Sequence, residues 1–171
     1  MVRPLTAEDA AVYREVRLAA LQQDPDAFIT TAAEFEARTA DSLAAQLTPR
    51  PTFVTYGAFL NGELTGLTTL AREERPRLGH RANLLGVSVA PAARGQGGGD
   101  ALMRAALAHA RGWTGVTSVH LAVTETQAAA RRLYERHGFH VLGTQPDAVR
   151  DAEGRSLAEH HLVLQLDAAT A

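Results

Sequence analysis

The chain has 171 residues, of which 46% are hydrophobic and 21% are charged, and this composition is typical of one folded domain with a sizeable core. Its formal net charge of −2 argues against a basic surface for nucleic acid or for a membrane. It contains neither Cys nor Lys, which excludes disulfides, thiolate nucleophiles, Cys-ligated metals and any chemistry that needs its own lysine amine.

The N-terminal segment does not have the pattern of a targeting sequence. Charged side chains at Asp9, Arg14, Glu15 and Arg17 interrupt the apolar run that a signal peptide needs. No apolar run of 18 residues follows, so no membrane span is expected. Together with the lack of Cys, this favours a cytoplasmic protein with one domain over residues 1–171.

Helices are predicted at the start of the chain. Thr6 followed by Asp9 is an acidic version of the capping box, and apolar residues then recur at helical spacing to about Gln22. Pro25 marks the end of that helix. A second helical region is predicted within 32–47, before Pro49.

The rest of the chain alternates strands and helices. Asn61–Gly62 between two β-rich segments predicts a hairpin. Strands are predicted at Thr52–Leu60, Glu63–Arg72, Asn83–Ala90, Val116–Val123, Phe139–Thr144 and Leu157–Leu166. Helices are predicted at Gly97–Arg111 and Gln127–His137, with Gly112 and Gly138 after them, and the tail Asp167–Ala171 is expected to fray. This order indicates an α/β fold with a mixed sheet (α+β).

A glycine-rich loop between a predicted strand and a predicted helix carries the strongest chemical signal. The loop residues are Arg94, Gly95, Gln96, Gly97, Gly98 and Gly99. Glycines allow close approach of a ligand, and their N–H groups together with a helix N-terminus form an anion site. Arg94 adds a cation, so a diphosphate is the expected ligand.

Several interpretations of this loop compete. A Walker A loop needs a Lys, and a dinucleotide-binding G-x-G-x-x-G would need a small residue where Asp100 stands. An acyl-CoA type of loop, V-x-P-x-x-R-x-x-G-x-G, matches at Val89, Pro91, Arg94, Gly97 and Gly99. For the loop alone, a flexible turn that leads into a helix remains an alternative.

A second motif follows the next predicted strand. The segment Gln127–Phe139 matches N-x-x-A-x-x-L-Y-x-x-x-G-F at Ala130, Leu133, Tyr134, Gly138 and Phe139. With both motifs in the right order, the chain resembles the GNAT superfamily of N-acetyltransferases. Gln127 replaces the usual Asn, and Asp100 stands where a small hydroxyl residue is common. Asp100 is expected to point to solvent, because near a diphosphate its charge would repel the ligand.

The resemblance implies where the co-substrate acetyl-CoA binds. It would lie between two parallel strands that splay apart, here 83–90 and 116–123. The pantetheine arm would contact the backbone of Val87, Ser88 and Val89. The resemblance assigns the remaining contacts to the N–H groups of Arg94–Gly99 and to Gln127 and Ala130.

The resemblance also implies direct attack of a primary amine on the thioester in a ternary complex, which suits a chain without Cys. Tyr134 is then the general acid for the departing thiolate, although its spacing also fits a tyrosine packed on an apolar helix face. Glu125 and His80 are candidate bases, each of which also fits an exposed loop residue, and Glu159 and His160 are weaker ones. A water relay is a further possibility. The His pairs lack metal-ligand spacing, so no metal site is expected.

The resemblance places the acceptor near the N-terminal helices, the Arg72–Arg81 loop and the last strands. Nearby glutamates favour a cationic amine, and nearby arginines favour a carboxylate or only a solvated loop: Glu34, Glu36, Glu73, Glu74, Arg72, Arg75, Arg77 and Arg81. The acceptor, a small molecule or a peptide, stays open. A homodimer through the apolar strand 162–166 is a further expectation. The alternatives to an enzyme are a non-catalytic acyl-CoA sensor module and an unrelated nucleotide-binding or structural protein.

Overall fold

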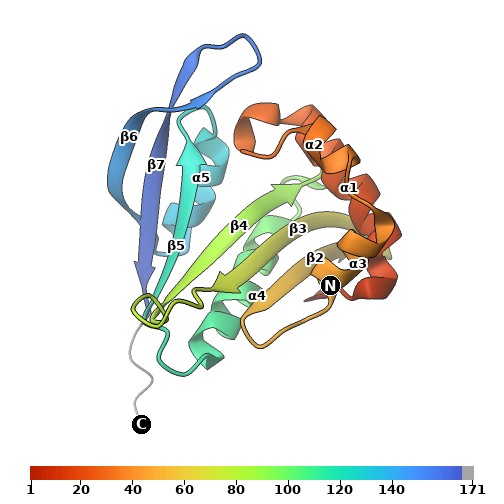
Figure 1. Ribbon diagram of the computed structural model, residues 1–171, viewed down its shortest axis with the longest axis horizontal. Helices are drawn as coiled ribbons and strands as arrows, with labels where there is room; N and C mark the ends of the chain where they lie inside the picture. Colours follow the sequence, from red (N-terminus) through yellow and green to blue (C-terminus); the bar gives the residue numbers. More distant parts are fainter. Residues whose placement is uncertain (167–171) are drawn as a thin grey trace.

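The computed structural model describes residues 1–166 and contains a seven-stranded mixed sheet with helices on both faces (Figure 1). The strand order is β1-β2-β3-β4-β5-β7-β6, and β4 with β5 is the parallel pair at its centre. This confirms the predicted fold class. The expected fraying of 167–171 lies outside the described residues.

The elements have the following bounds. The strands are β1 (Val2–Pro4), β2 (Phe53–Leu60), β3 (Glu63–Arg72), β4 (Arg81–Val89), β5 (Ser118–Thr124), β6 (His140–Arg150) and β7 (Ser156–Gln165). The α-helices are α1 (Ala10–Gln23), α2 (Ala32–Glu36), α3 (Ala40–Leu47), α4 (Gly98–Gly112) and α5 (Ala128–Arg136). Short 3-10 turns are η1 (Ala7–Asp9), η2 (Pro25–Ala27) and η3 (Pro91–Ala93).

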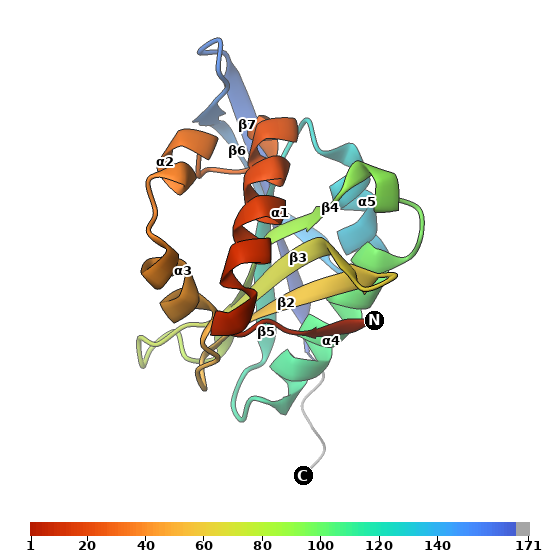
Figure 2. The same ribbon diagram turned by 90° about the vertical axis from the view of Figure 1, so that its right-hand side faces the viewer.

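The helices form two layers. Helices α1 to α3 cover one face of the sheet, and α4 and α5 cover the other (Figure 2). The apolar stripe predicted for α4 is confirmed, because its members are all buried: Leu102, Met103, Ala106, Leu107 and Ala110. A second core joins α1 to α3 with Leu64 and Leu67 of β3.

The N-terminal helices begin where their caps predict. Asp9 accepts a hydrogen bond from the Thr6 N–H at 2.9 Å and two from the Arg3 guanidinium at 2.7 and 2.8 Å. The first turn is η1, so α1 itself begins at Ala10. The region 32–47 contains two helices, because Thr31 and Thr39 each cap a helix of their own.

Three expectations about the C-terminal half need correction. Gly112 is the last residue of α4 and not the residue beyond it. Strand β6 continues to Arg150, since Pro146 and the positive φ of Asp147 fall at an irregularity that an edge strand tolerates. The proposed dimer edge at 162–166 is wrong, because β7 pairs with β5 on one side and β6 on the other.

Candidate active site

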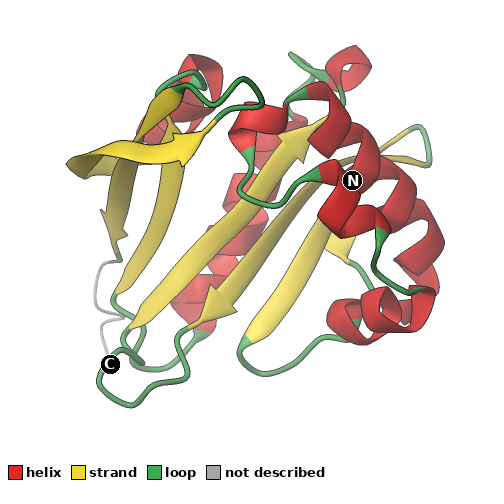
Figure 3. Ribbon diagram, turned by 45° about the horizontal axis from the view of Figure 1, so that its top comes forward, coloured by secondary structure: helices red, strands yellow, loops and turns green. Residues whose placement is uncertain are grey.

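A cavity opens where the two central parallel strands separate. Strands β4 and β5 are paired at three positions, Arg81↔Ser118, Ala82↔Val119 and Asn83↔His120, and then diverge (Figure 3). The cavity has a volume of about 660 Å³ and is lined by β4, β5, the end of α1, the glycine loop and α5. The expected splayed strands are therefore present, and a cavity lies between them.

A bulge in β4 turns this strand toward the cavity. Between the pairs Thr69↔Leu85 and Leu67↔Ser88, β3 advances two residues while β4 advances three. Gly86 supplies the extra residue with φ +62°, a conformation that favours glycine. Gly86 lines the cavity and was not among the predicted site residues, although a lone glycine inside an apolar strand indicates a bulge.

The glycine loop presents free backbone donors beside the cavity. Gly95 and Gly97 have φ values of +75° and +78°, and Gly97 is the N-cap of α4. Within residues 1–166 the N–H groups of Gly95, Gln96 and Gly97 have no hydrogen-bond acceptor. A Cβ at Gly95 or Gly97 would meet nothing within 4 Å. This loop fits an anionic ligand such as a diphosphate.

The other predicted cofactor residues mostly line the same cavity. These are Val87, Ser88, Val89, Arg94, Gly95, Gly97, Gly98, Gly99, Gln127 and Ala130. Gln96 does not, because its side-chain amide donates to the carbonyl of Ala92. The Ser88 hydroxyl is buried and has no partner among the described residues. Such an orphaned group calls for a polar ligand atom, which the amides of a pantetheine arm contain.

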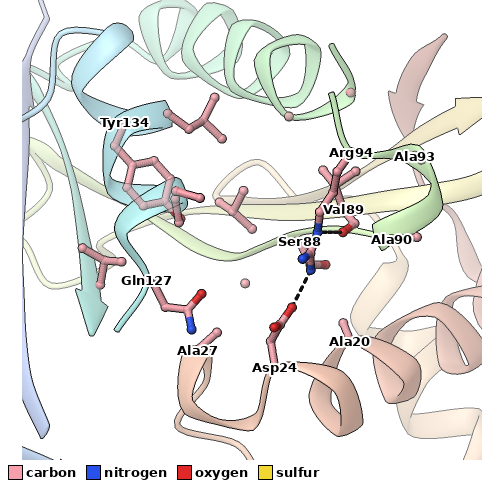
Figure 4. Close-up of a pocket in the computed structure, with 18 of the residues that line it drawn as sticks. Ala20, Asp24, Ala27, Ser88, Val89, Ala90, Ala93, Arg94, Gln127 and Tyr134 are labelled. Atoms are coloured by element: carbon pink, nitrogen blue, oxygen red, sulfur yellow. Dashed lines mark hydrogen bonds and ion pairs between the residues drawn. The ribbon is translucent and has the colours of Figure 1, made fainter. Parts of the chain in front are cut away.

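Arg94 lies at the cavity and contacts the end of α1. Its Nε donates to the carbonyl of Val89 at 3.0 Å, and its Nη2 donates to Asp24 at 2.5 Å (Figure 4). Asp24 was not among the predicted site residues, since nothing local connects it to the loop.

Asp100 does not extend freely into solvent as expected. Its carboxylate accepts a hydrogen bond from His137 at 3.0 Å and contacts Arg136 at 3.3 Å. Burial opposes ionisation of Asp100, but the His137 hydrogen bond and the Arg136 charge outweigh it and lower the pKa. Arg136 at the end of α5 and His137, its C-cap residue, thus hold the carboxylate that the sequence places beside the glycine loop.

Tyr134 lies on α5 with its side chain directed into the cavity (Figure 4). Its ring is buried and packs edge-on against Phe139 at a centroid distance of 6.2 Å. The hydroxyl makes no hydrogen bond to a described residue. Burial raises the pKa of Tyr134 far above its ordinary value, so it is a neutral hydroxyl with a proton to donate.

The structure does not bring the two candidate bases to this cavity. Glu125 accepts a hydrogen bond from the N–H of Ala158 at 2.8 Å and joins the end of β5 to β7. His80 is exposed and precedes β4, where β4 and β5 are still paired. Neither residue lines the cavity. No group of three His, Asp or Glu side chains within residues 1–166 is placed to bind a metal ion.

A second cavity of about 320 Å³ lies between the N-terminal helices and the sheet, and Gly86 lines both cavities. The charged residues that sequence analysis assigned to the acceptor do not line it. Several have local partners instead: Glu34 with Thr31, Glu73 with Asn83, Glu74 with Thr52, and Arg72 with the carbonyl of Gly79. The charged residues of this cavity are Arg17 and Arg38, which sequence analysis had not proposed.

Comparison with known proteins places the chain in a family. The model of the acetyltransferase (GNAT) family matches residues 15–139. The chain belongs to the GNAT acetyltransferase family. This confirms the resemblance and the expectation of an acyltransferase. No helix among residues 1–166 of this GNAT protein is both long enough and apolar enough to cross a membrane.

Relatives of this GNAT protein include named enzymes and solved structures. An L-amino acid N-acetyltransferase of Escherichia coli is 30% identical over 63% of this chain and 67% of its own length. A mycothiol acetyltransferase of Salinispora tropica is 40% identical over 46% of this chain and 25% of its own length.

Two structures share the fold over nearly the whole chain. An acetyltransferase of Salmonella typhimurium, solved with acetyl-CoA, has a TM-score of 0.83 at 23% identity and covers 100% of this chain and 96% of its own. A GCN5-related N-acetyltransferase of Kribbella flavida has a TM-score of 0.76 at 25% identity, with 97% of both chains covered.

Proposed function

We propose that this protein transfers an acetyl group from acetyl-CoA to a primary amine by direct attack in a ternary complex. The observation that carries this proposal is the shared position of Gly86. The cavity between β4 and β5 carries the phosphate loop, and the cavity beneath α1 does not, yet both meet at this bulge. Two reactants held on either side would therefore meet without a covalent enzyme intermediate.

The residues of the larger cavity support acetyl-CoA as the donor. The donors of the glycine loop and Arg94 match a diphosphate, and the orphaned Ser88 hydroxyl lies along the strand edge that a pantetheine arm would follow. Bound acetyl-CoA supplies the activated acetyl group. The bulge at Gly86 turns the backbone of β4 toward the cavity in which bound acetyl-CoA would present its thioester.

Tyr134 supports the second half of the reaction. In the proposed step the amine nitrogen bonds to the acetyl carbon, the carbon–sulfur bond breaks, and the Tyr134 hydroxyl protonates the sulfur. The neutral amine gives up one proton to water, water returns a proton to Tyr134, and the products are the N-acetyl compound and free CoA. The raised pKa of Tyr134 keeps its proton available. General acid help of this kind contributes about 10²–10⁴-fold in rate.

The E. coli relative is named for L-amino acids, and we propose amino acids as the first acceptors to test. Purified protein is titrated calorimetrically with acetyl-CoA, with NAD and ATP as controls, and the release of CoA thiol is then followed with a panel of amines. Binding of acetyl-CoA with amine-dependent release of CoA supports the enzyme. Binding without turnover of any amine supports the alternative, a non-catalytic acyl-CoA sensor.

A further inference from the structure

Arg17 is a partly buried cation that has no partner within residues 1–166. Its Nη1 is buried, and its guanidinium makes neither a hydrogen bond nor an ion pair with residues 1–166. The guanidinium lies over the ring of Phe28, 4.2 Å from its centroid, which fixes its position. A buried charge without an ionic partner is costly, so such a group is expected where a ligand supplies the opposite charge.

The cavity around Arg17 selects for an anion. Its lining holds two guanidinium groups, those of Arg17 and Arg38, and no Asp or Glu. Arg38 donates to the neutral acceptors Gln46 Oε1 and the Ser42 carbonyl, so its charge is not cancelled. A polyamine or an aminoglycoside would bring further positive charge into this space, whereas a carboxylate would pair with the Arg17 guanidinium.

The position of Arg17 sets the distance between the anion and the reacting amine. A Cβ on Gly86 would lie 3.4 Å from Arg17 Nη1, and Gly86 lines both cavities. An anion held by Arg17 therefore lies directly beside the point where donor and acceptor meet. In an acceptor held this way, the carboxylate and the reacting amine must be separated by very few bonds, as they are in an α-amino acid.

The remaining lining of the cavity favours an apolar side chain on the acceptor. Leu85 lies in the central strand β4 and is nevertheless 49% exposed, with Phe35, Phe53 and Leu67 around the same space. Exposed apolar surface on the floor of a cavity is typical of a ligand site. The polar groups there that accompany the arginines, such as Tyr13 and Gln46, are uncharged.

We propose that Arg17 forms a carboxylate-binding subsite, so that the protein accepts free α-amino acids with apolar side chains and rejects the corresponding amines without a carboxylate. This subsite rests on the proposed function for its role in catalysis. The binding of a carboxylate by Arg17 does not depend on turnover.

The test compares matched acceptors with the wild-type protein. L-leucine, L-methionine and L-phenylalanine are paired with 3-methylbutylamine, 3-(methylthio)propylamine and 2-phenylethylamine, and spermidine is added as a cationic acceptor. CoA release is measured as kcat/KM. Each amino acid is expected to exceed its decarboxylated partner by on the order of 100-fold, the loss typical of removing one partner from a buried charge pair. Equal or faster turnover of the amines or of spermidine overturns the subsite.

Arg17→Met then tests the residue, with Arg104→Met on the exposed face of α4 as the matched control. In Arg17→Met the ratio of amino-acid to amine kcat/KM is expected to fall by about 100-fold, and in Arg104→Met it is expected to stay at the wild-type value. Acetyl-CoA binding in the other cavity verifies that Arg17→Met is folded. A folded variant that keeps the wild-type ratio overturns the proposal, and the wild-type comparison decides alone if the variant does not fold.

Binding measurements separate this subsite from the proposed function. The three amino acids are titrated into wild-type and Arg17→Met protein saturated with CoA. Binding that depends on Arg17, without turnover of any amine, means that the subsite exists and the enzyme proposal fails. Turnover of amino acids that does not depend on Arg17 means that the enzyme proposal holds and the subsite proposal fails. Absence of both binding and turnover overturns both.

Discussion

Arg94 and Asp24, which both line the larger cavity, form an ion pair although 70 residues separate them in the sequence. The pair joins Arg94, the first residue of the glycine loop, to the C-terminal end of α1. Its side chains remain 52% and 36% exposed, so water screens the interaction and it contributes about 1 kcal/mol at most. A diphosphate in this cavity would compete with Asp24 for the same guanidinium.

Asp24→Asn is therefore expected to strengthen acetyl-CoA binding. The substitution frees Arg94 and removes a negative charge near the ligand. The Kd should fall about two- to fivefold, which is the change expected when a surface ion pair no longer competes with the ligand. Isothermal titration at low and high salt measures it, and the gain should shrink at high salt. Asp26→Asn is the control, since Asp26 does not line the cavity. Weaker binding in Asp24→Asn would mean that Asp24 holds Arg94 in its binding position.

Gly97→Glu is expected to abolish acetyl-CoA binding. Gly97 has φ +78°, which disfavours any side chain, and a carboxylate there would face the bound diphosphate. The Kd should rise at least about 100-fold in the same titration, since like charges in contact cost several kcal/mol. Gly112→Ala at the end of α4 is the control, because a Cβ there meets nothing and the Kd should not change. Retained binding in Gly97→Glu would place the diphosphate elsewhere.

Tyr134→Phe is expected to lower kcat by about 10²–10⁴-fold and to change the Kd of acetyl-CoA by less than about twofold. The neutral hydroxyl is the active form, so activity is present below its pKa and lost above it. Because burial raises the pKa of Tyr134, ionisation of Tyr134 should cause no loss of kcat up to about pH 10. Tyr56→Phe is the control, since the Tyr56 hydroxyl pairs with His109 Nδ1 and does not line the cavity. Full activity in Tyr134→Phe would remove Tyr134 from the mechanism.

Asp9 makes the unfolding free energy of the protein depend on pH. The Arg3 guanidinium and the Thr6 N–H lower the pKa of Asp9 to about 2 from 3.8. A lowered pKa stabilises the folded state above the unfolded value, and this contribution is lost as pH falls from about 4 to about 2. Wild type should exceed Asp9→Asn by about 1 kcal/mol in unfolding free energy at pH 6, because Arg3 is 40% exposed and screening reduces the gain. Urea unfolding from pH 6 to pH 3 measures the decline of this difference, and Arg3→Met should reduce it to the part that Thr6 supplies.

Local patterns in the sequence were sufficient for most of the elements and for the glycine loop of the proposed cofactor site. The apolar spacing of α4, the Asn61–Gly62 hairpin and the Thr6 cap depend on neighbours within a few residues, and the structure has all three. The glycine loop belongs to this group as well, because its chemistry resides in consecutive backbone N–H groups. The chain order of strand, loop and helix then placed these donors at a helix N-terminus.

The tertiary structure alone decided which side chains share a space. Arg17 and Gly86 come together because α1 packs over the bulge in β4, and Asp24 reaches Arg94 because α1 ends beside the loop. The tertiary structure also separated His80 from the cavity, since His80 precedes β4 and the cavity lies toward the other end of this strand. It placed β7 between β5 and β6, so that β7 has no free edge. These relations join residues distant in the sequence, and helix packing and strand register determine them. A one-dimensional pattern records neither, so the sequence determined the glycine loop of the proposed donor site while the packing of α1 on the sheet determined the proposed acceptor site.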